Sequence, residues 1–232
     1  MMPSAVILAG GLATRLYPLT QDIPKSLLDV NGRPFIAHQL DLLKRNGFSH
    51  VVLCLGQHGA AVQEVIGDGS EFGLTVEYVY DGPKLKGTGG AILGVLHLVS
   101  DPFFVLYGDS YLDIAYKEIY KAYSKKSLMT VFKNECKWDV SNVIFNEGVI
   151  KSYNKTLKDP DMHYIDYGLG LFSKSVFSSY AKDEFLDLAK VYQNILAEGE
   201  LSGYEVFTRF YEIGSFEGLI ETRAYLLKNG ER

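Results

Sequence analysis

The chain has 232 residues but only two cysteines, Cys54 and Cys136, which belong to no Cys-x-x-Cys or Cys/His pattern. Two cysteines cannot build a disulfide framework, and Cys54 lies in an apolar run where a buried packing role is expected. Every apolar run is shorter than the roughly 18 residues that cross a bilayer, and the first residues lack the basic region of a signal peptide. We therefore expect a cytoplasmic protein with no membrane partner.

An excess of basic residues is also missing, because 23 lysines and arginines face 28 aspartates and glutamates and the net charge is −5. Nucleic acids and anionic membranes need a basic surface, so we expect neither as a partner. The five histidines form no metal-binding pair, and no Gly-x-Ser-x-Gly sequence occurs. A zinc centre and a serine hydrolase are therefore not expected.

What the sequence does contain is an ordinary globular composition, 47% hydrophobic and 22% charged, which excludes a disordered chain. In its first two-thirds, apolar runs that predict strands alternate with amphipathic stretches that predict helices. The predicted strands are 5–9, 50–55, 75–80 and 103–107, and the predicted helices are 34–46, 60–66, 89–99 and 114–123. Such alternation predicts parallel β-α-β units with right-handed crossovers.

Beyond about residue 127 the pattern changes to closely spaced strands, separated by turns such as 146–148. The predicted strands here are 129–133, 142–145, 149–154 and 164–172. Residues 175–199 are predicted to be helical again. No linker or repeat interrupts the chain, so we expect a single domain over 1–232. Its expected class is α/β, with a Rossmann-like open mixed sheet flanked by helices.

The most informative stretch begins in the first predicted strand and reads Leu8-Ala9-Gly10-Gly11-Leu12-Ala13-Thr14-Arg15, followed by Pro24-Lys25. Glycines allow backbone amides to approach an anion, Arg15 can hold phosphate oxygens with two hydrogen bonds, and Lys25 can act as a point charge. A tight turn with two surface cations is the alternative. The combination favours a phosphate site, although neither a Walker P-loop nor a Gly-x-Gly-x-x-Gly fingerprint is present.

This stretch resembles the signature of the sugar-1-phosphate nucleotidyltransferases, roughly Ala-Gly-Gly-x-Gly-Thr-Arg-Leu-x-Pro-Leu-Thr and then Pro-Lys. The resemblance spans residues 4 to about 226, with Ala13 in place of the third glycine. It implies a GT-A-like nucleotidyltransferase architecture, with a nucleotide-binding half at about 1–126 and a sugar-binding half at about 127–232. It also implies that Arg15 and Lys25 are catalytic. The nucleotide-binding residues of the loop would be Leu8, Ala9, Gly10, Gly11, Ala13 and Thr14.

Gly87-Thr88-Gly89-Gly90-Ala91 opens a predicted helix, and in the family this segment lies beside the nucleobase and the sugar. We therefore expect Gly87 and Thr88 to bind the nucleotide, whereas the alternative is a helix start that needs small residues for packing. Asp81 precedes the segment and is a candidate for contact with the base or a sugar hydroxyl. Gln57 is a weaker candidate still, and a solvated loop position is favoured for it over a ligand contact.

The run Leu106-Tyr107-Gly108-Asp109 ends the fourth predicted strand, and open α/β sheets bind ligands beyond the carboxyl ends of their strands. Asp109 is a candidate Mg²⁺ ligand there, as the family's Gly-Asp aspartate is, and a helix cap is the alternative. Residues 210–215 resemble the family's Trp-x-Asp-x-Gly-Thr segment, whose aspartate is a second metal ligand. Glu212 stands at that position, one methylene longer. Asp113 is expected to cap the next helix.

Two further segments resemble the family's sugar-binding segments. Tyr153-Asn154-Lys155 resembles a Glu-Lys-Pro segment, so Lys155 would contact the sugar phosphate, with a solvated strand-end lysine as the alternative. Residues 165–170 resemble the strand that closes over the sugar, where Asp166 would accept a hydrogen bond from a sugar hydroxyl or else serve a turn. Gly108 and Gly168 complete the sugar-binding candidates.

The resemblance implies an enzyme that joins a nucleoside triphosphate (NTP) to a sugar 1-phosphate with Mg²⁺ as cofactor and releases pyrophosphate. Short members commonly serve surface-polysaccharide or cell-wall synthesis. Among the subgroups, the sequence most resembles short enzymes that use mannose- or heptose-1-phosphate with GTP. A non-catalytic sensor of nucleotide sugars and a phosphocholine cytidylyltransferase on the same scaffold are the alternatives. The aromatic content of 13% leaves room for a homo-oligomer interface.

Overall fold

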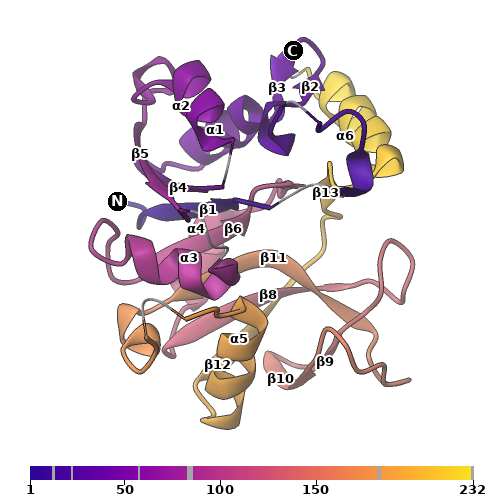
Figure 1. Cartoon of the computed structure of the whole chain (residues 1–232). Coiled ribbons are helices and arrows are strands. Elements are labelled where there is room, and N and C mark those ends of the chain that lie inside the picture. The colour runs from indigo at the N-terminus through magenta and orange to yellow at the C-terminus, as the bar shows by residue number, and fades with distance from the viewer. Residues whose placement is uncertain (12–13, 22, 57, 83–85, 182–183, 231–232) are drawn as a thin grey trace.

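A mixed sheet, with nine strands in the described part of the chain, runs through the molecule (Figure 1). The computed structural model describes residues 1–11, 14–21, 23–56, 58–82, 86–181 and 184–230. The predicted nucleotide contact at Ala13 and the weaker candidate Gln57 therefore lie outside the described residues. None of the helices described is long and apolar enough to cross a membrane.

Four parallel strands form one side of the sheet, in the order β5-β4-β1-β6. They are β1 (Ala5–Ala9), β4 (His50–Leu55), β5 (Thr75–Tyr80) and β6 (Phe103–Tyr107). Side chains of β1 alternate between the two faces, so Ile7 joins one hydrophobic cluster and Val6 joins the other. Strands that are covered on both faces are apolar throughout. The predicted α/β fold, an open mixed sheet flanked by helices, is confirmed.

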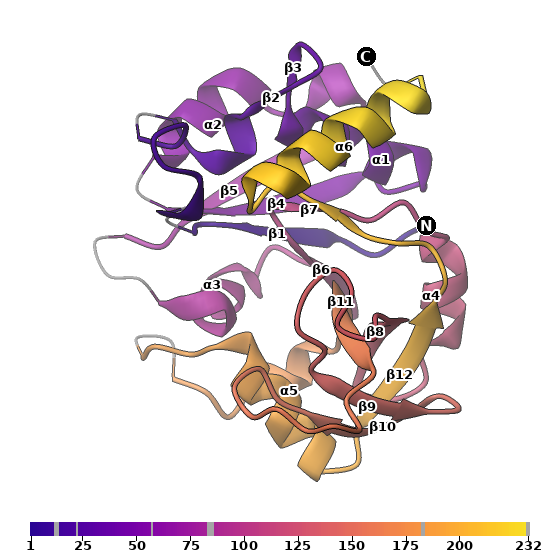
Figure 2. The same ribbon diagram turned by 90° about the vertical axis from the view of Figure 1, so that its right-hand side faces the viewer.

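Helices cover both faces of this sheet: α1, α2 and α4 pack on one face, and α3 and α5 pack on the other. Their bounds are α1 (Phe35–Arg45), α2 (Gly59–Ile66), α3 (Gly87–Val95), α4 (Tyr116–Ala122) and α5 (Leu188–Ala197). A third hydrophobic cluster joins α6 to α1 and to the hairpin of β2 and β3 (Figure 2). These elements are α6 (Phe216–Lys228), β2 (Asp29–Val30) and β3 (Arg33–Pro34).

The second half of the chain extends the sheet beyond β6. The added strands are β8 (Ser127–Lys133), β9 (Val143–Asn146), β10 (Val149–Tyr153), β11 (Tyr164–Phe172) and β12 (Leu201–Val206). β11 is antiparallel to both β6 and β8, and β12 is parallel to β8. The register between β11 and β8 shifts between Asp166 and Gly170, and Gly168 has a φ of +95°, so the strand departs from regular pairing there.

Short elements shape the loops between these strands and helices. They are the 3-10 helices η1 (Thr14–Leu16), η2 (Lys25–Leu27), η3 (Ser70–Phe72) and η4 (Lys174–Phe177), and the strands β7 (Ser110–Tyr111) and β13 (Tyr211–Glu212). β7 and β13 pair with each other in a separate antiparallel ladder. This ladder brings the C-terminal region to the end of β6.

The structure differs from the prediction in three respects. The helix predicted over 175–199 is confirmed only in part, since the 3-10 helix η4 ends at Phe177 and α5 begins only at Leu188, where Asp187 accepts a hydrogen bond from Ala189 N. Residues 184–187 form no helix because the backbone of Leu186 is bonded to the start of α3. Asp113 does not cap α4, whose N-cap is Ala115. β12 and α6 lie where no element was predicted.

Candidate active site

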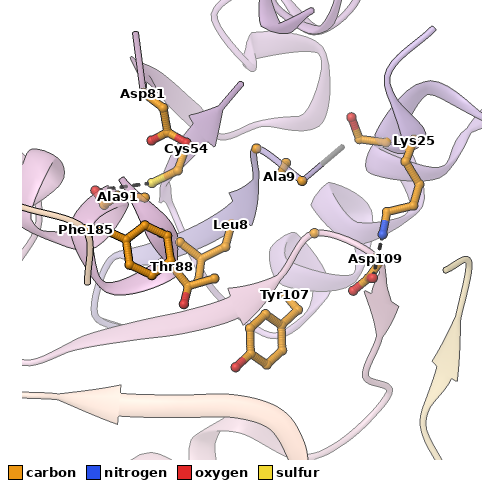
Figure 3. A pocket seen from close by; sticks show the side chains of 15 residues that line it. Leu8, Ala9, Lys25, Cys54, Asp81, Thr88, Ala91, Tyr107, Asp109 and Phe185 are labelled. Atoms are coloured by element: carbon orange, nitrogen blue, oxygen red, sulfur yellow. Dashed lines mark hydrogen bonds and ion pairs between the residues drawn. The ribbon is translucent and has the colours of Figure 1, made fainter. Parts of the chain in front are cut away.

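The first cavity, of about 290 Å³, lies where β1, β4 and β6 end (Figure 3). It is lined by Leu8, Ala9, Gly10, Gly11, Lys25, Ser26, Cys54, Asp81, Gly87, Thr88, Ala91, Tyr107, Gly108, Asp109 and Phe185. Seven residues of the predicted nucleotide site therefore come together in its wall. Thr14 lies beside Arg15 in η1.

The two ends of the first cavity differ in polarity. At one end Lys25 Nζ lies 2.6 Å from Asp109 Oδ2 in a partly buried ion pair. At the other end Figure 3 shows Cys54, Phe185 and Asp81, and Asp81 is the only acidic side chain of these three. Burial raises the pKa of Asp81, and the charge of Lys86 opposes this shift. Burial also raises the pKa of the Cys54 thiol, so that side chain acts as apolar wall.

Two glycines of the first cavity are required by close approaches of other atoms. A Cβ atom at Gly10 would lie 2.9 Å from Asp81 Oδ2, and one at Gly108 would lie 2.8 Å from Ala9 Cα. A side chain at position 10 would therefore push Asp81 away, and one at position 108 would separate β6 from β1. Gly108, predicted to bind sugar, lies in the wall of the first cavity.

The glycine run at the start of α3 serves both packing and the cavity. Leu186 O accepts hydrogen bonds from Gly89 N and Gly90 N at 2.8 and 3.1 Å, so these amides are used within the fold. A Cβ at Gly89 would meet the Leu186 side chain at 2.7 Å, which is the packing alternative. Gly87 and Thr88, in contrast, line the first cavity.

The second cavity, of about 340 Å³, adjoins the first and shares Tyr107 and Asp109 with it. It is lined by Arg15, Tyr107, Asp109, Ser110, Trp138, Asp139, Asn142, Lys155, Ile165, Asp166, Tyr167, Gly168, Phe210, Glu212 and Ser215. Three of the predicted sugar contacts, Lys155, Asp166 and Gly168, lie in this wall. A ligand in each cavity would therefore meet the other at Asp109.

Charged groups from three distant parts of the chain surround Gly214 near this junction. A Cβ atom there would lie 2.7 Å from Glu212 Oε2, 3.2 Å from Arg15 Nη2 and 3.3 Å from Asp109 Oδ2. The pairing of β13 with β7 sets Glu212 opposite Ser110, and Ile213 N donates to Asp109 O at 2.9 Å. Asp109 and Glu212, which the resemblance implies to be metal ligands, therefore lie at the same end of the sheet.

The pair of carboxylates at this junction suits a hard cation. Glu212 accepts hydrogen bonds from Gly214 N and, at 2.5 Å, from Ser215 Oγ, which fix its orientation while leaving lone pairs for a ligand. Mg²⁺ is usually held by one or two carboxylates, with water and phosphate oxygens completing its octahedron. Within the described ranges no group of three or more His, Cys, Asp or Glu residues is placed to bind a metal. Asp109 and Glu212 are two carboxylates at the junction that could hold Mg²⁺ together with phosphate oxygens and water.

One part of the wall of the second cavity is built around Asp166. Its carboxylate accepts hydrogen bonds from Gly168 N at 3.1 Å and from Tyr153 Oη at 3.3 Å. Burial raises the pKa of Asp166, and the nearby Lys155 and these hydrogen bonds offset only part of the shift. Lys155 Nζ donates to Tyr107 Oη at 3.3 Å, so it points towards the boundary between the cavities.

Several cavity residues were not predicted to be site residues, although some of them lie within the quoted motifs. The first cavity adds Ser26, Cys54, Ala91, Tyr107 and Phe185, and the second adds Ser110, Trp138, Asp139, Asn142, Ile165, Tyr167, Phe210 and Ser215. Tyr107 could have been found, because it directly precedes Gly108-Asp109 at a strand end. Trp138 is the only tryptophan of the chain, which is only a weak indication that it lies in a binding site. Phe185 carries no sequence signal.

An open α/β sheet with a glycine loop, two cations and a carboxylate pair at the carboxyl ends of its strands is typical of enzymes that act on nucleoside phosphates. A family model described as nucleotidyl transferase matches residues 4–229. The chain therefore belongs to the nucleotidyl transferase family, and it is a sugar-1-phosphate nucleotidyltransferase, as its motifs indicated.

Relatives support this assignment over most of the chain. A D-glycero-α-D-manno-heptose 1-phosphate guanylyltransferase of Campylobacter jejuni is 32% identical over 182 residues, which cover 78% of this chain and 80% of that enzyme. An N-acetylmuramate α-1-phosphate uridylyltransferase of Neisseria meningitidis is 28% identical over 226 residues, covering 95% and 96%. The solved structure of the inositol-1-phosphate CTP transferase from T. maritima shares the fold, with a TM-score of 0.81, 23% identity and coverage of 96% and 95%.

Proposed function

We propose that the enzyme transfers GMP from GTP to the 1-phosphate of a heptose or mannose-type sugar, forming a nucleotide sugar and pyrophosphate. The observation that carries this proposal is the meeting of two cavities at Asp109, with Lys25 on one side and Arg15 and Glu212 on the other. Each substrate has a cavity of its own, and the charged groups lie where the two phosphates would come together.

The first cavity suits the donor nucleotide. Its charged end, with Lys25 and the glycine loop, receives the triphosphate, and its apolar end receives the base. Asp81 supports guanine as the base, because the N1–H and N2–H groups of guanine can both donate to one carboxylate. Uracil and thymine offer a single N–H at the corresponding edge. The similarity to a heptose 1-phosphate guanylyltransferase supports the same choice.

The second cavity suits the sugar 1-phosphate. Lys155 points towards the cavity boundary, where it would attract the phosphate, and Asp166 would accept a hydrogen bond from a sugar hydroxyl. The phosphate oxygen of the acceptor then attacks the α-phosphorus in line. This nucleophile is already ionised, so no general base is required, and the protein must align two anions and offset their repulsion.

The charges at the junction are arranged for that task. In the structure Lys25 is paired with Asp109, and Arg15 lies beside Glu212 and Asp109, so two cations face two carboxylates. Asp109 and Glu212 would hold Mg²⁺, which supplies additional positive charge to the phosphates when bound. Arg15 and Lys25 then stabilise the charge that develops on the α-phosphate and the leaving pyrophosphate.

The phosphocholine alternative is not favoured by the second cavity. A choline site needs aromatic faces that are open to a cation. The face of Trp138 is already covered by Arg209, whose Cζ lies 3.5 Å from the ring centroid. A sensor without activity is also not favoured, because binding alone does not require two cations and two carboxylates at one junction. These residues are Arg15, Lys25, Asp109 and Glu212.

A screen of pyrophosphate release tests the proposal. GTP, ATP, CTP, UTP and dTTP are each combined with heptose, mannose, glucose and N-acetylmuramate 1-phosphates and with phosphocholine. We expect the highest kcat/KM for GTP with heptose or mannose 1-phosphate. A clear preference for UTP with N-acetylmuramate 1-phosphate would replace the proposed substrates with those of the other relative.

Exchange of Glu212 tests its proposed metal role. Glu212→Asp keeps the charge and is expected to retain substantial activity. Glu212→Gln keeps an acceptor for Gly214 N or Ser215 Oγ but removes the charge, so we expect a folded enzyme with strongly reduced Mg²⁺-dependent turnover. Turnover is measured against Mg²⁺ concentration for both variants, and melting curves show whether each variant is folded. Together they separate a metal role of Glu212 from a structural role. Wild-type turnover of Glu212→Gln would show that Glu212 only holds the start of α6.

Exchange of Asp166 is expected to stabilise the fold while weakening acceptor binding. Because burial raises the pKa of Asp166 in the folded state, its ionised form opposes folding above that pKa. Asp166→Asn should therefore raise the Tm at neutral pH, and the gain should vanish below about pH 3.9, where the carboxyl is protonated in both states. The KM for the sugar 1-phosphate should rise. The exposed Glu64→Gln is the control, and a Tm gain that did not change with pH would contradict this account.

A further inference from the structure

The apolar end of the first cavity has an aromatic wall that comes from the second half of the chain. We propose that Phe185 stacks on the nucleobase of the donor nucleotide and thereby completes the nucleotide site. This inference rests on the proposed function, because it takes the first cavity to be the nucleotide site.

The exposure of Phe185 and its place in the cavity point to a ligand surface. Its side chain is 71% exposed although it lines the first cavity, so the ring presents an open face rather than packing into the core. Figure 3 shows the ring beside Thr88 and Leu8, far along the cavity from Lys25 and Asp109. A group held at this end is therefore remote from the phosphates, which is the position of the base in a nucleotide.

The segment that carries Phe185 is fixed to the start of α3 on its C-terminal side. Leu186 N donates to Lys86 O at 2.9 Å, and Leu186 O accepts from Gly89 N and Gly90 N. Leu188 N donates to Thr88 Oγ1 at 2.9 Å. These bonds fix the backbone directly after Phe185 before any ligand binds, which lowers the ordering cost of binding.

Gly87 shows how closely this segment lies on α3. Its φ is +75°, and a Cβ atom there would lie 2.5 Å from Leu186 O and 3.0 Å from Phe185 Cε2. A side chain at position 87 would thus displace both the segment and the ring. Gly87 serves the nucleotide site by letting Phe185 approach.

The chemistry of this end of the cavity fits a flat aromatic ligand. Leu8, Cys54 and Ala91 provide an apolar wall, and Phe185 adds an aromatic face. Stacking of a base on an aromatic side chain is tolerant of base identity, because every base has a π-face. Phe185 would therefore supply affinity for any nucleotide, whereas Asp81 would supply the choice between bases.

Binding measurements on Phe185 variants test this assignment. Affinities for GTP and for inorganic tripolyphosphate, which has no base, are measured for wild type, Phe185→Ala and Phe185→Tyr. We expect Phe185→Ala to weaken GTP binding by about tenfold or more, as for loss of an aromatic stacking partner. Tripolyphosphate binding should be unchanged, and Phe185→Tyr should restore GTP binding. Phe207→Ala, at an 83% exposed phenylalanine outside both cavities, should behave as wild type.

Each other outcome overturns the inference in a distinguishable way. Normal GTP binding by folded Phe185→Ala would place the base elsewhere and leave the proposed function intact. Equal losses for GTP and tripolyphosphate would assign Phe185 a structural role. If tripolyphosphate binds too weakly to measure, steady-state kinetics of Phe185→Ala replace that comparison. The inference then requires that the KM for GTP rises while the KM for the sugar phosphate stays unchanged. Absence of any NTP binding by the wild type would refute the proposed function itself.

Discussion

Replacement of Asp109 by asparagine is expected to reduce turnover by at least about a hundredfold, as expected for removal of a key electrostatic group from an active site. Asp109 lies in the wall of both cavities and pairs with Lys25 at 2.6 Å. The amide keeps the shape but removes the charge that Mg²⁺ would need, and it leaves Lys25 without a negatively charged partner. The measurement is kcat as a function of Mg²⁺ concentration, with a melting curve to show that the variant is folded.

Asp113→Asn is the matched control for this experiment. Asp113 is four residues further along the chain, accepts a hydrogen bond from Tyr225 Oη at 2.9 Å and lines neither cavity. Its exchange should leave the dependence on Mg²⁺ unchanged. Turnover of Asp109→Asn within a few-fold of the wild type would contradict the metal assignment.

Removal of either cation, by Arg15→Ala or Lys25→Ala, is expected to lower kcat by at least about a hundredfold through lost stabilisation of transition-state charge. Arg15 lines the second cavity and Lys25 the first, so they approach the reacting phosphates from different sides. Both effects should therefore appear in kcat, because each interaction strengthens as negative charge develops.

Lys121→Ala provides the comparison, since Lys121 is an exposed lysine of α4 whose partner is Glu118. This variant should retain wild-type kinetics, and all variants should unfold near the wild-type temperature. Near-normal turnover of a folded Arg15→Ala/Lys25→Ala double variant would show that the phosphates do not bind at the glycine loop.

The central fold could be predicted because local and global signals agree there. β6 occupies the predicted residues because a buried strand leaves an apolar run, and β5 does so because its residues alternate as in a half-buried strand. The position of Asp109 then follows from the rule that ligands bind beyond the carboxyl ends of such strands. Glu212 was reached only through its resemblance to a family motif.

The remaining parts depend on long-range contacts that leave little trace in the sequence. α6 buries Leu219 and Leu226 but exposes Ile220 and Leu227, so its apolar residues do not form one clear face. The segment 184–187 is held by the backbone of α3, about a hundred residues earlier in the chain, which no local pattern reveals. Trp138 likewise reaches the second cavity from a loop without a recognisable motif.

The fate of labelled GTP in the wild-type reaction tests the central claim most directly. GTP labelled in the α-phosphate or in the γ-phosphate is incubated with heptose 1-phosphate or mannose 1-phosphate and Mg²⁺. The account predicts that the α-label appears in a nucleotide sugar and the γ-label in an equal amount of pyrophosphate. Transfer of the γ-label to the sugar phosphate, or its release as inorganic phosphate without a nucleotide sugar, would contradict it.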